Sequence, residues 1–451
     1  MDRNTDFGSI ITEILKYGGS TFAALVATSI YTVTDEIFIG HALGIFGLAA
    51  MGVVYPVTLI ATALTTLAEV GSSAVVAEAI GKGDLKRAES LMRGNYFYLV
   101  IFGTLIAIIS VILVAPILDI LSAGDDDINI IIGATDYLHI SLLAIPFMLV
   151  VTLTQTFMRC IDKPGHVLYL LATTSLTNIV LDAILILLLD FGLQGAAAAT
   201  LLAQVFGAAI SFWYFKFSKQ KFKTSFSICE LPVMFKECQI GLGFAIIELT
   251  IFPVGFFVNA IIIEHNAPQL LAAASIINVV LSLVYLPLTG LDTGVQPLVS
   301  RLYAAKKFPH LLKVMKFSCF VTTAMTLFMF FIMMFFVREI SEIFVAEDVV
   351  LTDDIIDFVR YGFVLYPFVA VYTWLLGLMA ALEDTWRNIF ISVLAPIAQI
   401  TIVYILSIVA PIEMLSLHYS IIDLLGAVFA LLLAVPFLKS KGLPMKKIFT
   451  N

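Results

Sequence analysis

Apolar runs long enough to cross a lipid bilayer recur along the whole chain. Residues 97–118 and 319–337 are clear examples, since a helix needs about 20 consecutive apolar residues to span the hydrocarbon core. Only 13% of the 451 residues are charged, whereas about 25% is usual in soluble domains. The pattern predicts an all-α polytopic membrane protein.

The apolar runs and the polar breaks between them predict twelve transmembrane helices. The expected ranges are 18–40, 48–78, 94–119, 132–160, 166–190, 195–217, 240–264, 270–302, 314–338, 355–382, 388–411 and 417–438. Of the 25 Lys and Arg residues, only Arg338 and Arg360 fall beside odd-numbered loops, which leaves 25 − 2 = 23 on one side. Because cytoplasmic loops are rich in Lys and Arg, both termini are predicted to be cytoplasmic and the chain to lie in the inner (plasma) membrane.

The sequence repeats itself weakly at an offset near 223 residues. For example, EVGSSAVVAEAIGKGD (69–84) corresponds to DTGVQPLVSRLYAAKK (292–307). Six spans return the chain to its starting side, so the two copies have the same orientation, as in the parallel repeats of some secondary transporters. The expected domains are a six-helix lobe over 1–217, a cytoplasmic loop over 218–238, and a second six-helix lobe with a short basic tail over 239–451.

Two aspartates of the first lobe are predicted to lie at similar depth in the membrane. Asp35 precedes His41 by six residues in the first span, roughly 9 Å inside the outer end of its helix. Asn178 and Asp182 are an i, i+4 pair in the fifth span and share one helix face. Thr200 adds a hydroxyl in the sixth span. These residues can therefore meet inside the first bundle.

Three more acids interrupt apolar spans, namely Glu69, Glu248 and Asp292. No intramembrane Lys or Arg is apparent to pair with them or with Asp35 and Asp182. A buried carboxylate without a basic partner readily takes up a proton or a cation, so these acids are predicted to be functional. Other polar and aromatic groups could line a substrate cavity or simply join helices: they are Gln155, Tyr366, Tyr372 and Gln399.

No catalytic or nucleotide-binding motif is found. The glycine-rich stretch GKGDLKR at 81–87 lacks P-loop spacing, and neither a Ser/His/Asp set nor an HExxH motif occurs. The chain is therefore predicted to be no enzyme, to need no cofactor, and to use an ion gradient rather than ATP. The basic loops are explained by topology, so no nucleic-acid partner is expected.

Several stretches resemble the multidrug and toxic compound extrusion (MATE) transporters. They are YTVTDEIFIGHALGIFGLAAMG, EVGSSAVVAEAIGKGDLKRAE, and NIVLDAILI with GLQGAAAATLLAQ. The resemblance covers essentially the whole chain and implies twelve helices in two six-helix lobes, the MATE/MOP fold. It also implies ion coupling through Asp35, Asn178, Asp182 and Thr200, while GLDTGVQPLV with Asp292 is most similar to the MepA-type branch.

The sequence departs from the family pattern at three places. No acid lies in the core of the tenth span, where some sodium-coupled members have one. Gly18 and Gly19 stand where many members have a proline early in the first span, and Phe244 stands where a Gly-x-Pro usually opens the seventh. A coupling step that needs a first-span proline kink is not available here, although glycines also permit bending.

Together these features favour a secondary antiporter that exports organic cations, acts as a monomer in membrane lipid, and takes H+ or Na+ at Asp35 and Asp182. One alternative is a flippase for lipids or lipid-linked oligosaccharides, which would be expected to carry intramembrane Lys or Arg for a pyrophosphate. A second is an intramembrane transferase, which would be expected to carry a large polar catalytic loop.

Overall fold

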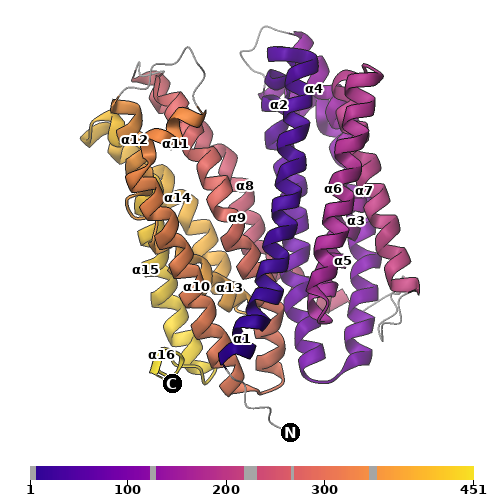
Figure 1. Cartoon of the computed structure of the whole chain (residues 1–451), viewed down its shortest axis with the longest axis vertical. Helices are drawn as coiled ribbons and strands as arrows, with labels where there is room; N and C mark the ends of the chain where they lie inside the picture. Colours follow the sequence, from indigo (N-terminus) through magenta and orange to yellow (C-terminus); the bar gives the residue numbers. More distant parts are fainter. Residues whose placement is uncertain (1–6, 122–127, 218–230, 266–268, 345–352, 451) are drawn as a thin grey trace. The chain divides into compact units, whose positions relative to one another are not determined.

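The computed structural model describes residues 7–121, 128–217, 231–265, 269–344 and 353–450. These residues are almost entirely helical and contain no strand (Figure 1). Eleven helical segments in the described ranges are long and apolar enough to cross a membrane. The expected eighth span corresponds to α9 (Gln269–Ala304), a further helix of 36 residues. The predicted all-α polytopic class is confirmed.

The remaining helices follow the predicted spans in order. They are α2 (Ser20–Gly81), α3 (Leu85–Leu121), α4 (Ile128–Ser141), α5 (Ile145–Cys160), α6 (Pro164–Asp182), α7 (Gly192–Phe217), α8 (Leu231–Glu264), α10 (Phe308–Phe335), α12 (Asp353–Phe363), α13 (Phe368–Ala381), α14 (Thr385–Val409) and α15 (Leu417–Ser440). Three short helices are α1 (Phe7–Ile14), α11 (Val337–Phe344) and α16 (Met445–Thr450). Helix α8 begins inside the expected connecting loop 218–238, whose residues 218–230 lie outside the described ranges.

Glycine and proline explain the breaks in these helices. The first and second spans are continuous in α2 except at Gly44, whose φ of 60° and ψ of −146° belong to a region that only glycine adopts easily. A 3-10 turn, Leu142–Ala144, separates α4 from α5 just before Pro146. A break also precedes Pro367, between α12 and α13. Proline lacks the amide hydrogen of a helix interior, so it stands near the start of the next helix.

The contacts divide the chain into two compact units, residues 19–241 and residues 242–451 together with the first eighteen residues. The sequence reading placed those first residues in the first lobe instead. The two points of division, after Gly18 and after Gly241, are 241 − 18 = 223 residues apart. They therefore occupy equivalent positions of the predicted repeat. The first and seventh spans each start in one unit and continue in the other.

Glycines sit where helices cross most closely within each unit. In the unit 19–241, a Cβ at Gly71 would lie 2.1 Å from the Glu237 carbonyl oxygen, and one at Gly241 would lie 2.2 Å from the Leu67 carbonyl oxygen. In the other unit, a Cβ at Gly294 would lie 2.6 Å from the Tyr17 carbonyl oxygen. Gly71 and Gly294 are again 294 − 71 = 223 residues apart. The repeat is thus reproduced in backbone packing as well as in sequence.

Polar contacts also hold the start of the first span, near Tyr17, in the unit 242–451. Glu13 of α1 accepts a hydrogen bond from Nε2 of His310 on α10 at 2.7 Å. The Arg301 guanidinium donates to the hydroxyl of Tyr17 at 3.3 Å, and Tyr17 is only 1% exposed. The start of the first span is therefore part of the core of the unit that contains α9 and α10.

Candidate functional site

Asp35 and Asp182 lie together inside the unit 19–241. Asp35, on α2, is 7% exposed, and Asp182, the last residue of α6, is fully buried. The two carboxylates act on each other electrostatically. Within the described part of the chain, neither oxygen of Asp182 nor Oδ1 of Asp35 has a hydrogen-bond partner. The structure therefore brings the two predicted aspartates together; their role remains a prediction.

An amide and a hydroxyl border this acidic pair. Asn178 lies one turn before Asp182 on α6 and is 2% exposed. Its Nδ2 donates to Oγ1 of Thr200 on α7 at 3.5 Å, a long hydrogen bond, while its Oδ1 has no partner among the described groups. All four predicted coupling residues thus belong to one cluster of oxygen-bearing side chains.

Two tyrosines complete the cluster, and sequence reasoning missed both. Tyr137 of α4 is hydrogen-bonded to Thr200 and interacts electrostatically with Asp35 and Asp182. Tyr31 precedes Asp35 by one turn of α2 and interacts with the same two aspartates. The i, i+4 spacing of Tyr31 and Asp35 is a signal that could have identified the first tyrosine. Tyr137 has no comparable signal.

A local irregularity of the helix follows Asp182 directly. Residues Ala183–Leu188 form a π-helix, after which Asp190 has a positive φ of 56°. π-Helical turns occur mostly as short insertions and frequently at functional sites. A π-helix has more residues per turn than an α-helix. The side chains after Asp182 are therefore rotated about the helix axis relative to those of the segment that carries Asn178 and Asp182.

This arrangement suits a small hard cation. Its potential ligands are carboxylate, amide and hydroxyl oxygens, which such cations prefer. Two carboxylates at short range repel each other, so the uptake of one proton or one monovalent cation relieves the repulsion. No group of three or more His, Cys, Asp or Glu side chains suited to a metal ion occurs among the described residues.

Two predicted acids lie apart from this cluster, in the unit that contains residues 242–451. Glu248 on α8 is half-buried, and Asp292 on α9 is hydrogen-bonded to Thr373 of α13. Asp292 also lies beside Gly377, whose Cβ would be 3.9 Å from the Asp292 side chain. Each unit therefore has its own acids.

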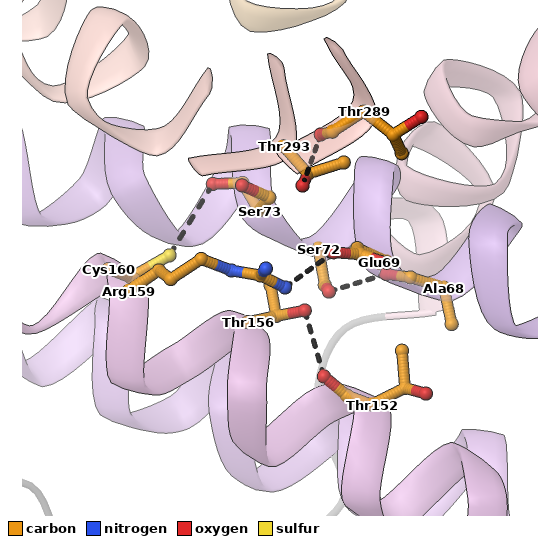
Figure 2. Close-up of polar contacts among 10 residues, drawn as sticks. All are labelled: Ala68, Glu69, Ser72, Ser73, Thr152, Thr156, Arg159, Cys160, Thr289 and Thr293. Atoms are coloured by element: carbon orange, nitrogen blue, oxygen red, sulfur yellow. Dashed lines mark hydrogen bonds and ion pairs between the residues drawn. The ribbon is translucent and has the colours of Figure 1, made fainter. Parts of the chain in front are cut away.

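Glu69 corrects a prediction. It was expected to have no basic partner, yet it forms an ion pair with the Arg159 guanidinium (Figure 2). Arg159, at the end of the expected fourth span (132–160), lies in α5 and is only 2% exposed. Next to it, the thiol of Cys160 faces the carbonyl of Ser73 at 3.8 Å. Glu69 thus joins α2 to α5 and is not a free carboxylate.

The expected cavity residues differ in their surroundings. Tyr366 is fully buried in an apolar cluster of the unit 242–451, yet its hydroxyl has no hydrogen-bond partner among the described groups. The ring of Tyr372 lies against Gly426, where a Cβ would be 3.0 Å from the ring. Gln155 and Gln399 are partly exposed. Their role in substrate binding stays a prediction.

The model of the MatE family matches residues 21–184 and 245–405, which is 164 + 161 = 325 of the 451 residues. This chain belongs to the MatE family. It is therefore a multi-pass membrane transporter and not an enzyme, and the resemblance found in its sequence is confirmed. The matched segments include Asp35, Asn178 and Asp182, whereas Thr200 lies in the gap between them.

Similar proteins carry drug-resistance names. The chain is 22% identical to the probable multidrug resistance protein YoeA of Bacillus subtilis over 335 residues, 71% of each chain. It is 23% identical to the multidrug export protein MepA of Staphylococcus haemolyticus over 303 residues, 66% of each chain. It is thus similar to the MepA group that its eighth span had suggested.

Solved structures show the same fold. A MOP superfamily transporter of Pyrococcus furiosus superposes with a TM-score of 0.85 at 19% identity, covering 95% of this chain and 96% of that one. The MATE transporter VcmN of Vibrio cholerae superposes with a TM-score of 0.87 at 18% identity, covering 98% and 99%. The predicted MATE/MOP fold is confirmed.

Proposed function

We propose that this MatE transporter is a secondary antiporter that exports organic, cationic compounds in exchange for H+ or Na+. The observation that carries the proposal is the buried, electrostatically interacting pair Asp35 and Asp182, in which Oδ1 of Asp35 and both oxygens of Asp182 lack hydrogen-bond partners among the described groups. The names of the similar YoeA and MepA proteins support multidrug export as the direction of transport.

Coupling follows from the charge of the pair. In the proposed cycle, Asp35 and Asp182 take up the ion in one accessible state and release it in the other. An ion drives such a cycle only through a difference in its affinity for the inward- and outward-open states. Thr200 and Asn178 border the two aspartates, and Tyr137 is hydrogen-bonded to Thr200. The proposed orientation has both termini in the cytoplasm, on the Lys/Arg-rich side.

The test is ion-driven efflux of a cationic dye from proteoliposomes, with sodium and pH varied separately. Asp35→Asn and Asp182→Asn should each abolish ion-driven efflux, because one carboxylate can no longer exchange its cation. Asp190→Asn is a matched control: it makes the same charge change in the same span, at an exposed residue with a left-handed φ that Asn tolerates. Wild-type efflux in both site variants would refute the proposal.

The structure also bears on the flippase alternative. The sequence argument against it was the lack of intramembrane Lys or Arg, whereas Arg159 is buried within α5. Its guanidinium is already paired with Glu69 and is therefore not available to a pyrophosphate without breaking that ion pair. The antiporter remains the better-supported function.

A further inference from the structure

Asp423 is a buried acid of α15 that the predicted coupling site does not use. It is 8% exposed and lies in the twelfth span, within the unit that contains residues 242–451. No ion pair to Asp423 is formed by the described Lys, Arg and His side chains. By the repeat offset it corresponds to Thr200, since 423 − 223 = 200. The second unit thus places a carboxylate where the first has a hydroxyl of its candidate site.

Three tyrosines lie near this carboxylate. Asp423 acts electrostatically on the hydroxyl groups of Tyr285 on α9, of Tyr366 just before α13, and of Tyr372 on α13. The rings of Tyr285 and Tyr366 meet edge to face with centroids 6.2 Å apart. The Tyr372 ring packs on Gly426, one turn after Asp423 on the same helix. Phenol groups from three different segments therefore lie within electrostatic range of one acid.

One of these phenols is unsatisfied. Tyr366 is fully buried, and its hydroxyl has no hydrogen-bond partner within the described part of the chain. Leaving a buried hydroxyl unpaired costs about 1–3 kcal/mol, so such a group inside a native core calls for a ligand or a function. A cation held at Asp423 would accept the lone pairs of this oxygen, and a proton on Asp423 would be donated to it.

The polar groups continue along α9 on both sides of Asp423. Asn278, Tyr285 and Asp292 are seven residues apart, so they share one face of α9 at steps of roughly 10 Å. Asn278 accepts a hydrogen bond from the Tyr419 hydroxyl of α15 at 3.0 Å, and Asp292 is hydrogen-bonded to Thr373 of α13. Asp423 therefore lies midway along a row of polar contacts through this unit.

We infer that Asp423, with Tyr285, Tyr366 and Tyr372, is a second cation site of the transporter, and that it takes one proton or one Na+. A single carboxylate balances only one positive charge, which favours a monovalent cation over a divalent one. The tight packing of Tyr366 and of Tyr372 on Gly426 excludes a large organic cation. This inference rests on the proposed function only in assuming that the bound cation is one that the transporter exchanges.

The experiment counts bound cations on the purified full-length protein in detergent. One arm measures saturation binding of 22Na+, and the other measures protons taken up when a weakly buffered sample is acidified. Asp423→Asn should bind one cation fewer than wild type in one arm. Asp357→Asn, which removes a half-exposed acid of the same unit, should bind as wild type does. Equal counts for wild type and Asp423→Asn in both arms would overturn the inference.

Two more variants test the inference if Asp423→Asn does not fold and separate the Asp423 site from the coupling site. If Asp423→Asn does not give monodisperse protein, Tyr366→Phe preserves the ring and removes only the unpaired hydroxyl; it should weaken cation binding several-fold, and unchanged affinity would overturn the inference. The Asp35→Asn/Asp182→Asn double variant should keep the cation that Asp423→Asn loses. A double variant with wild-type counts would instead contradict the proposed coupling site and leave the Asp423 site standing.

Discussion

The closest helix crossing in the unit 19–241 yields a sharp prediction for Gly71→Ala. A Cβ at Gly71 would lie 2.1 Å from the Glu237 carbonyl oxygen, 2.7 Å from its carbonyl carbon and 3.1 Å from its Cα. All three are backbone atoms of α8, so no side-chain rotation can relieve the overlap. Helices α2 and α8 must separate locally to accept even one methyl group.

The size of the effect follows from these distances. Ordinary van der Waals contact begins at 3.4 Å, so the helices must move apart by about 3.4 − 2.1 = 1.3 Å at this point. Overpacking of this kind costs about 1–3 kcal/mol and occasionally more. A glycine in an unobstructed helix behaves in the opposite way, because Gly→Ala gains about 0.5–1 kcal/mol there.

The matched control is on the same helix. Gly52 of α2 has nothing within 4 Å of its Cβ position, so Gly52→Ala should be neutral or stabilising. Helix α8 offers the same comparison. A Cβ at Gly241 would lie 2.2 Å from the Leu67 carbonyl oxygen, whereas a Cβ at Gly255 would have no atom within 4 Å. In each pair the crossing variant should be less stable than its control by about 1.5–4 kcal/mol.

The assay is unfolding in mixed micelles with a rising SDS fraction, followed by far-UV circular dichroism. If Gly71→Ala is as stable as Gly52→Ala, and Gly241→Ala as stable as Gly255→Ala, the two helices do not cross in backbone contact. The assignment of the start of the seventh span to the unit 19–241 would then no longer be supported by backbone packing.

Three further changes should have measurable effects. Gly44→Ala forces a side chain into a glycine-only conformation and should cost about 1–3 kcal/mol in the same titration; wild-type stability would exclude this backbone geometry. Glu69→Gln leaves the buried Arg159 without its carboxylate and should destabilise, by less than the roughly 3–5 kcal/mol of a fully buried pair because Glu69 is 23% exposed. Adding Arg159→Met should restore much of that loss, and a double variant no more stable than the single one would contradict the pairing. Tyr137→Phe removes the hydrogen bond to Thr200 and should lower ion-driven efflux about 2- to 10-fold without changing the unfolding midpoint; unchanged efflux would show that this bond plays no part in transport.

Hydropathy predicted the spans well because it depends on local composition. Every expected span coincides with one or more observed helices, and the breaks before Pro146 and Pro367 follow from proline chemistry alone. Hydropathy does not say which unit a helix start belongs to. The packing of Tyr17 against Gly294 depends on contacts between residues nearly 300 positions apart, which no local rule contains.

The candidate site was predictable to the extent that its residues are charged. An acid in an apolar run is conspicuous because of its cost in lipid, and this rule identified Asp35 and Asp182. The same rule applies to Asp423, which the sequence reading overlooked. Tyr137 carries no charge and cannot be distinguished from a packing residue by sequence. Arg159 lies at the very end of the expected fourth span, 132–160, and was not recognised as a partner for Glu69, because its burial depends on how α2 packs against α5.

The acids are distributed differently in the two halves of the repeat, and this difference limits how the transporter can work. Helix α6 carries Asp182, whereas its counterpart α14 has no acid along its length. Helix α15 carries Asp423, whereas its counterpart α7 has none. Glu69 and Asp292 do occupy matching positions of the repeat, but Asp182 and Asp423 do not, so the carboxylates of the two candidate sites are not equivalent. Two sites built on non-equivalent helices need not have the same affinity or bind the same cation. One unit can therefore bind its cation while the site of the other unit is empty. If both units bind cations, their binding constants should therefore differ. A binding isotherm with a single class of equivalent sites would argue against two non-equivalent cation sites.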